Sequence, residues 1–468
     1  MSRPNVVWIT LDSVRADHTS IDGYDRPTTP SLSELRKQGL GFRNCIAHGR
    51  STLPSSGAIL TGLAPSRTTL GITGDVLPEN VRTIPQRFAN DGYRTAALSG
   101  NSFVGSETGL DRGFEQYQWL TSSRLHQVGP TILIRYLRNL WRHSAGLTLD
   151  SAKHSTPFLM NQMAKQWLRK FDDEERPFFF YLHYNEPHRP YYPPKGYVDK
   201  FTENIEMSAR EAAESSLRIH RNLNEIIANG TNLTAAEYDA LEAMYDAEIA
   251  YTDEMIGRLI AWMREQGLDD TIIVVTADHG ELFGEYGLLS HKFVLHDAVT
   301  RVPLVIARIG ESETEFGSSF SVEEDDIVQH TDVMRTLLSM ADVDESGTIG
   351  VNLRREKREF AISQRGPPDF DQMYQYNSNY DTDRFHDGIL TALRTPEWKY
   401  LKSESRTELF ALPDESTNVS TDHPAAADRL DELLESWLDR YGKPVGESRE
   451  GTFSNAAKRQ LRELGYID

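Results

Sequence analysis

The sequence predicts an α/β protein with a large, mostly parallel or mixed sheet sandwiched between helices. Two observations lead to this fold class. Apolar runs of strand length alternate with amphipathic segments of helix length, and an aspartate follows directly on two of the runs. Ligands bind at the carboxyl ends of strands in such sheets, so Asp12 and Asp278 mark the expected position of a functional site.

The predicted elements follow from hydrophobic periodicity and from capping signals. Thr234 and Glu237 form a capping box, which predicts a long helix that begins there and ends near Gly267. The strands are expected over residues 6–11, 95–99, 178–184 and 271–276, and shorter helices over 31–38, 54–60 and 84–90.

The pattern changes after residue 350. Short strand-like runs cover residues 360–363, 388–393 and 398–401, and a helical pattern follows over 425–441. We therefore expect a catalytic α/β domain over residues 1–345 and, packed on it, a smaller C-terminal subdomain over 346–468 with a short antiparallel sheet plus a helix.

Composition limits the partners of the protein. The 468 residues carry a net charge of −20, which argues against nucleic acid as a partner. Only twelve of the 50 basic residues are lysine, a bias expected of a halophilic source and equally of a GC-rich genome. A single cysteine excludes an internal disulfide. No apolar run reaches the ~20 residues of a transmembrane segment, and no signal peptide is recognised, so a cytoplasmic protein is expected. The oligomeric state stays open.

Two segments depart from the alternating pattern. Residues 121–157 are locally basic, with Arg135, Arg138 and Arg142 among apolar residues, and fit a surface helix that packs its apolar face or a lid or partner-binding element. Residues 311–326 are rich in Glu, Asp and Ser and are expected to form a solvated loop.

The strongest chemical signal is Thr276-Ala277-Asp278-His279-Gly280-Glu281. An apolar strand delivers an adjacent carboxylate and imidazole to its end, and Gly280 is expected to let the chain turn tightly. Carboxylate oxygen together with imidazole nitrogen suits a divalent metal such as Zn²⁺ or Mn²⁺. The alternative is a capping aspartate beside a surface histidine.

A second signal lies where Thr52 precedes the apolar helix that contains Pro54. The N-terminal dipole of that helix and its unpaired N–H groups would stabilise an alkoxide or an anionic substrate oxygen. The alternative for Thr52 is a simple N-cap.

Taken in order, these motifs resemble the sulfatase family within the alkaline phosphatase superfamily. The resemblance rests on Asp12, on Thr52-Leu53-Pro54-Ser55 with Leu60-Thr61-Gly62, on Asp278-His279-Gly280-Glu281 and on the later Lys292. It extends over nearly the whole chain. It implies a fold like that of alkaline phosphatase and a metal-dependent hydrolase of sulfuric or phosphoric esters.

The chain departs from the family at the nucleophile. Typical sulfatases carry Cys or Ser there and oxidise it to formylglycine, whereas this chain has Thr52, so no formylglycine is expected. Ser56 replaces the usual arginine of that motif, and Ser13 replaces the usual second aspartate. A sulfated threonine also lacks the exit by elimination that formylglycine provides. These changes favour a phosphorus ester over a sulfur ester.

The resemblance assigns a role to each remaining residue. Asp12, Thr52, Asp278 and His279 match the site of relatives with a threonine nucleophile, lipoteichoic acid synthases and phosphoethanolamine transferases among them. The four would bind one divalent metal, Ca, Mg, Mn or Zn, which activates Thr52 for attack. His188 would contact the substrate or protonate the leaving group, and Lys292 would bind anionic oxygens. Asn101, His183 and His291 are candidates for substrate binding.

The expected substrate is therefore an anionic small-molecule, glycan or lipid ester. Two other functions stay open. A phosphodiester head-group transferase would pass the Thr52 ester to a second alcohol instead of water. A non-catalytic member would only bind sulfated or phosphorylated glycans, and the retained metal residues argue against it.

Overall fold

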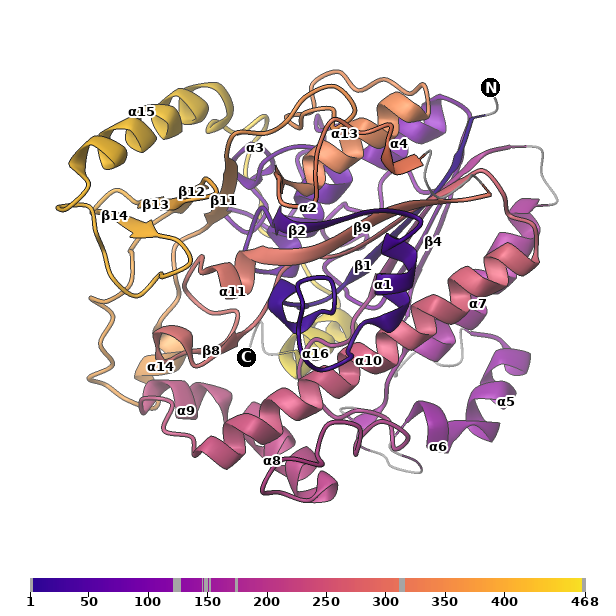
Figure 1. Cartoon of the computed structure of the whole chain (residues 1–468), viewed down its shortest axis with the longest axis horizontal. Coiled ribbons are helices and arrows are strands. Elements are labelled where there is room, and N and C mark those ends of the chain that lie inside the picture. Colours follow the sequence, from indigo (N-terminus) through magenta and orange to yellow (C-terminus); the bar gives the residue numbers. More distant parts are fainter. Residues whose placement is uncertain are drawn as a thin grey trace.

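The computed structural model describes residues 3–464, with gaps at 121–127, 145, 147–149, 151–152, 173–175 and 311–315. A twisted eight-stranded sheet crosses the molecule in the order β10-β2-β9-β6-β1-β5-β3-β4 (Figure 1). The fold class expected from the sequence is confirmed. The strands are β1 (Asn5–Leu11), β2 (Gly39–Ile46), β3 (Arg94–Ser99), β4 (Gln116–Trp119), β5 (Phe178–Tyr184), β6 (Thr271–Ala277), β9 (Arg301–Ile309) and β10 (Ile327–Val328).

The centre of the sheet is parallel and fully buried. β1 runs parallel to both neighbours, with Leu11 opposite Tyr184 on β5 and Ala277 on β6. Every residue of β5 and β6 is buried, as expected of strands covered on both faces. This register brings the residues that follow β1 and β6 to the same edge of the sheet.

Helices cover both faces (Figure 1). On one face lie α1 (Pro30–Arg36), α7 (Pro157–Asp172), the long α10 (Ala235–Glu265) and, packed on α10, α8 (Ala209–Arg221). On the other lie α2 (Thr52–Thr61), α4 (Ile84–Asn90) and α13 (His330–Met340). Shorter helices are α3 (Pro65–Thr68), α5 (Pro130–Arg138), α6 (Leu140–His143), α9 (Leu223–Ala228) and α11 (Asp297–Thr300).

A second, antiparallel sheet follows residue 346. It has the order β11-β12-β13-β14 and carries α15 against it. Its strands are β11 (Ala361–Arg365), β12 (Leu390–Arg394), β13 (Trp398–Lys402) and β14 (Thr407–Ala411), and the helices of this part are α14 (Asp371–Tyr374), α15 (Pro424–Tyr441) and α16 (Asn455–Glu463). The division into domains at residue 345 stays a prediction, because α16 returns to the large sheet.

The two segments singled out in the sequence are described in part. α5 packs Ile132 and Tyr136 inward and exposes Arg135 and Arg138, as expected of a surface helix, while residues 121–127 lie outside the described part. Of the expected loop over 311–326, residues 311–315 also lie outside it. Among the described residues, no helix is both long enough and apolar enough to span a bilayer.

Candidate active site

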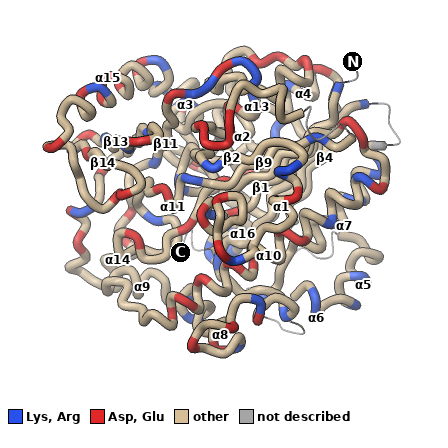
Figure 2. Tube along the Cα trace, viewed as in Figure 1, with Lys and Arg blue, Asp and Glu red and all other residues tan. Residues whose placement is uncertain are grey.

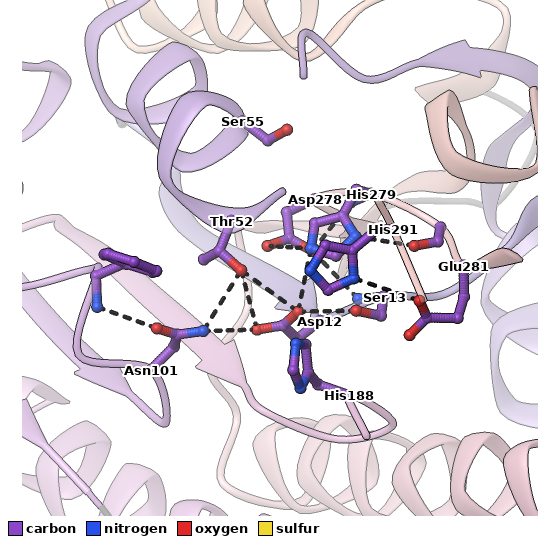
Figure 3. Close-up of polar contacts among 12 residues, drawn as sticks. Asp12, Ser13, Thr52, Ser55, Asn101, His188, Asp278, His279, Glu281 and His291 are labelled. Carbon is purple, nitrogen blue, oxygen red and sulfur yellow. Dashed lines mark hydrogen bonds and ion pairs between the residues drawn. The ribbon is translucent and has the colours of Figure 1, made fainter. Parts of the chain in front are cut away.

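The candidate site lies at the carboxyl edge of the large sheet. Asp12 follows β1, Asp278 and His279 follow β6, His183 lies near the end of β5, and Asn101 follows β3. Backbone hydrogen bonds from Asp12 N to Tyr184 O (3.0 Å) and from Asp278 N to Leu11 O (3.2 Å) extend the parallel pairing by one residue. The side chains of Asp12, Asn101, Asp278 and His279 point toward one another in Figure 3.

Asp12 is the centre of the polar contacts. Its Oδ2 accepts from Asn101 Nδ2 at 2.9 Å and lies 3.2 Å from His183 Nε2. Its Oδ1 accepts from Ser13 Oγ at 3.1 Å and lies 3.4 Å from His279 Nε2. All five side chains are buried, so the negative charge of Asp12 is held by hydrogen bonds and not by water.

Asp278 and His279 are oriented by backbone groups. Asp278 Oδ1 accepts from His279 N at 2.9 Å and from Ser13 N at 3.3 Å. Ser13 has a φ of 68°, a left-handed conformation that turns its N–H toward Asp278. His279 Nδ1 lies 2.8 Å from Gly280 O, and a carbonyl only accepts, so Nδ1 carries a hydrogen and Nε2 is the ring atom that faces the two carboxylates.

The structure corrects the reason for Gly280. The sequence predicts it as a tight-turn residue, but its φ is not positive. A Cβ at this position would lie 2.0 Å from the carbonyl oxygen of Ala298. Glycine is therefore required by the close approach of two backbones, a contact that includes the hydrogen bond from Gly280 N to Val299 O at 2.7 Å.

Burial and mutual repulsion shape the pKa values of the two carboxyls. Burial alone would raise the pKa of Asp12, but His188, His183 and His279 outweigh burial and hold that pKa well below its usual range. Burial, then repulsion from Asp12, raises the pKa of Asp278 to about 6. For His279, burial opposes charge, yet Asp278 and Asp12 raise its pKa to about 9. The site therefore has a strongly negative field.

These residues fit a metal ion. Ligand atoms of Asp12, His183 and Asp278 lie within 4.8 Å of one another, and all three side chains are buried. A second observation supports a metal ion at this position. Asp278 Oδ2 and His279 Nε2 lie 3.9 Å apart, and neither has a hydrogen-bond partner among the described residues. Buried polar atoms without partners are costly, and a shared cation would satisfy both.

Thr52 is the first residue of α2, all ten residues of which are buried. Ser51 is the N-cap, so Thr52 is not an N-cap residue, and the alternative drawn from the sequence is wrong. Thr52 Oγ1 lies 3.3 Å and 3.5 Å from the two oxygens of Asp12 and 3.4 Å from Asn101 Nδ2. Ser55 instead points away from this group and donates to Gly49 O (Figure 3).

The other residues predicted for the site are His188, His291, Lys292 and His183. The His279 and His291 rings are 4.5 Å apart, and the His188 and His291 rings 5.4 Å apart, which brings three imidazoles together. Lys292 extends to the second part of the chain, where its Nζ donates to Gln372 Oε1 on α14 at 3.2 Å. His183, expected to bind substrate, instead lies with the two aspartates in the group that could hold a metal.

Several supporting residues carry no role in the sequence prediction. Glu281 Oε1 lies 3.3 Å from His291 Nδ1, and Glu281 Oε2 accepts from Tyr191 Oη at 2.8 Å. Arg189 Nε donates to Ser290 Oγ at 3.0 Å and joins the loop that holds His188 to β8 (Leu289–Ser290), which pairs with β7 (Leu282–Phe283). Glu281 stands within the motif Asp278-His279-Gly280-Glu281, and Arg189 and Tyr191 follow His188 closely in the chain, so the neighbourhood of the predicted residues was the available signal.

Gln460 on α16 fixes the backbone on both sides of Asn101. Its Nε2 donates to Gly100 O at 2.7 Å, and its Oε1 accepts from Ser102 N at 2.9 Å. Asn101 in turn donates to Asp12 and Thr52. A residue 359 positions later in the chain therefore holds a loop of the site.

We expect Gln460→Leu to lower kcat about tenfold and to change KM little, because Asn101 would lose its fixed position while the other contacts stay. Steady-state kinetics well below the melting temperature measures this. Arg459→Leu, an exposed position on the same helix, is the control and should leave kcat unchanged. Equal losses in both variants would mean that α16 acts only through stability.

Comparisons with known proteins identify the family of the chain. Residues 4–343 match the family model described as Sulfatase. Arylsulfatase K of Homo sapiens is 25% identical over 93% of this chain and 82% of its own length. Arylsulfatase of Clostridium perfringens is 25% identical over 73% of this chain and 75% of its own length.

Solved structures show the same fold. Phosphonate monoester hydrolase of Agrobacterium radiobacter superposes with a TM-score of 0.72 and 21% identity, over 94% of this chain and 96% of that one. A second solved structure, of a protein in complex with its substrate D-glucosamine-2-N,6-O-disulfate, superposes with a TM-score of 0.69 and 19% identity. The match covers 94% of this chain and 98% of that one. Because the family model covers well over half of the residues, the chain belongs to the sulfatase family of ester hydrolases.

Proposed function

We propose that this chain is a metal-dependent ester hydrolase in which Thr52 is the nucleophile and a phosphorus ester is the preferred substrate. One observation supports this above all others. Thr52 Oγ1 lies 3.3 Å from Asp12 Oδ2 and 3.4 Å from Asn101 Nδ2, at the N-terminus of a buried helix. Ser13 Oγ also contacts Asp12, at 3.1 Å, but of these two hydroxyls only that of Thr52 lies at the N-terminus of a helix.

Asp12, Asp278 and His279, with the oxygen of Thr52, would hold one divalent cation. That cation would lower the pKa of the hydroxyl and polarise the ester. Two carboxylates with an imidazole are donors that Zn²⁺ and Mn²⁺ accept. Asn101 Nδ2 and the N-terminus of α2 would donate to the non-bridging oxygens of the substrate, where charge grows during attack.

The proposed reaction has two steps. Thr52 Oγ1 bonds to phosphorus as the bond to the ester oxygen breaks, and its proton leaves toward Asp12 Oδ2. The departing oxygen takes the electron pair and a proton, which we assign to His188. Water then attacks phosphorus and gives a proton to His188, the bond from phosphorus to Thr52 Oγ1 breaks, and Oγ1 takes back the proton from Asp12 Oδ2. Lys292 would bind anionic oxygens of the substrate from the side of α14.

The geometry of His188 supports proton transfer at one defined atom. Its Nδ1 lies 3.0 Å from Arg189 O, so Nδ1 carries a hydrogen and Nε2 is the atom that exchanges a proton with substrate. Burial lowers the pKa of His188 to about 4, against the attraction of Asp12. An anionic substrate beside the ring adds a negative charge and favours the protonated form.

A substrate panel tests the proposal. The metal-supplied protein is offered an aryl sulfate, an aryl phosphate monoester and an aryl phosphodiester, and products are resolved by mass. We expect turnover of a phosphorus ester and, in acid-quenched samples, a phosphoryl group on the peptide that contains Thr52. Turnover of the sulfate ester alone would reject the preference for phosphorus, and an adduct on another residue would reject the nucleophile.

We expect His188→Ala to lower turnover of alkyl esters about 10³-fold, with a much smaller loss for nitrophenyl esters. Alkoxides need a proton as they leave, whereas nitrophenolate does not. Rates for a series of leaving groups measure this. His220→Ala, which removes a partly buried imidazole that packs against Tyr191, is the control and should lower all rates alike. A loss in His188→Ala that is equal for all leaving groups would contradict the assignment.

A further inference from the structure

A cavity lies between α5, α7 and α10, on the side of the molecule away from the candidate site. Its volume is about 480 Å³, and its polar lining includes Arg135, Gln162, Lys165 and Arg169. Arg169 lies near the C-terminal end of α7, which leads to the amino end of β5, and Trp262 of the lining lies near the end of α10, which leads to the amino end of β6. The site with Asp12 lies at the opposite, carboxyl edge.

The charge of this cavity is opposite to that of the protein. The chain as a whole carries −20, yet the described residues of the cavity lining include three cations and no carboxylate. Figure 2 shows the basic positions along α5 and α7. Within the described part of the chain, no carboxylate forms an ion pair with Arg135, Lys165 or Arg169, whereas nearby Arg258 pairs with Glu254. Among the described residues, these three cations therefore have no carboxylate in direct contact.

The hydrogen bonds of the cations use neutral groups. Arg135 Nη1 donates to Gln162 Oε1 at 3.2 Å, and Lys165 Nζ donates to the carbonyl oxygen of Arg258 at 3.3 Å. Lys165 Nζ and Arg169 Cζ also lie 5.5 Å and 5.1 Å from the ring centroid of Trp262. Such contacts fix the cations in place but leave their charge uncompensated.

The pKa of Lys165 agrees with this arrangement. Burial lowers it first, and Arg169 and Arg258 lower it further against the attraction of Glu265. A bound anion would reverse these effects, since it would supply the missing opposite charge.

We propose that this cavity binds an oxyanion, a sulfate or phosphate group, through Arg135, Lys165 and Arg169. Arginine and lysine are the side chains that proteins use for such groups, and the apolar wall formed by Val128 and Ile132 leaves room for the organic part of a ligand. The group belongs either to an inorganic ion or to a sulfated or phosphorylated polymer. This binding site is separate from the ester hydrolysis proposed above and does not depend on it.

Fluorescence of Trp262 provides a local readout. Inorganic pyrophosphate and a short dextran sulfate are titrated at low ionic strength into the full-length protein, and the signal of Trp262→Phe is subtracted to remove the other six tryptophans. We expect a saturable change in the fluorescence of Trp262 on titration. If pyrophosphate suffices, the ligand is an inorganic ion, and if dextran sulfate acts at lower concentration, the ligand is a polymer. Either result supports the site.

Matched variants separate the cavity from general charge. Lys165→Gln with Arg169→Gln should weaken binding at least tenfold, and so should Arg135→Gln from the other helix. Arg138→Gln with Lys170→Gln removes the same charge from exposed positions outside the lining and should change binding less than twofold. Equal weakening by the two pairs, or a response that persists in Trp262→Phe, would overturn the proposal.

Discussion

Thr52→Ala should lower turnover about 10⁴-fold or more, the size of loss seen when a nucleophile is removed. The variant keeps the metal residues Asp12, Asp278 and His279 but has no oxygen that can attack. Thr52→Ser keeps the hydroxyl and loses only the methyl group that limits the rotation of χ1, so it should retain activity to within about 100-fold. Both losses are measured as initial rates, with the panel substrate that the wild type turns over fastest.

The stability of these variants should not follow their activity. The contacts of Thr52 Oγ1 to Asp12 and Asn101 are 3.3 to 3.5 Å long, so the loss of that hydroxyl should cost less than about 1 kcal/mol. Thr61, at the other end of α2, donates to Gly57 O at 2.6 Å. Thr61→Ala should therefore cost about 1 kcal/mol of stability and leave turnover unchanged.

This contrast makes the nucleophile assignment testable. Urea unfolding and initial rates, measured on the same samples, separate loss of fold from loss of chemistry. If Thr52→Ala kept the turnover of any ester in the panel, then Ser51 or another nucleophile would perform the attack. If both alanine variants lost activity in proportion to stability, α2 would be only a structural element.

The edge of the sheet that holds the site was predictable because apolar runs end there in charged residues. The runs before Asp12 and Asp278 are buried parallel strands, and their lengths agree with β1 and β6 to within one residue at either end. The order of the motifs then identified the family, which the match over residues 4–343 confirms.

Four strands of the large sheet, β2, β4, β9 and β10, were not predicted, and for β2 and β9 the reason is visible in the sequence. Pro303 in β9 argues against a central strand, since proline cannot donate to a neighbour. The structure resolves this with an irregularity in β2: Phe42 pairs with Leu304 and Cys45 with Val302, so two residues of β2 lie opposite Pro303. β2 itself begins with Gly39 and Gly41, which local propensity assigns to a turn after the preceding helix.

Contacts between distant segments were also beyond the sequence. His183 lies among the metal candidates because β5 pairs with β1, with Thr10 opposite His183. Gln460 holds the Asn101 loop because the last helix returns to the large sheet. Neither pairing leaves a local pattern in the chain, so only the three-dimensional arrangement assigns these side chains to the site.

Asp278→Asn should lower turnover about 10³-fold and, in metal-free protein, should raise stability. Metal binding would lose a charged ligand, so activity falls. In metal-free protein, burial and repulsion from Asp12 disfavour the charge of Asp278 and raise its pKa to about 6. Asn removes that charge, and its Oδ1 can still accept from Ser13 N and His279 N.

The effect should depend on pH in a defined direction. A folded-state pKa of about 6, above the usual 3.8, means that the folded protein holds a proton that the unfolded chain has released. The contribution of Asp278 to the stability of metal-free protein should therefore fall as pH rises from 4 to 6 and then level off. The gain from Asp278→Asn should be absent near pH 4 and reach on the order of 2 kcal/mol above pH 6.

Asp253→Asn is the matched control, because that carboxyl is also buried and also has a pKa raised to about 6. Both of its oxygens are used, however: Oδ2 accepts from Ser31 N at 2.8 Å and Oδ1 from Leu32 N at 2.9 Å. The amide can replace only one acceptor, so Asp253→Asn should lower stability by about 1 to 3 kcal/mol and leave turnover unchanged.

Thermal unfolding with chelator and with added metal measures both variants. Metal should raise the melting temperature of wild type more than that of Asp278→Asn, since only the wild type keeps both carboxylates for the cation. If Asp278→Asn destabilised the chelated protein as Asp253→Asn does, Asp278 would serve as a hydrogen-bond acceptor of the fold. A stabilised but inactive variant means instead that the fold keeps two repelling carboxylates together for the cation that activates Thr52.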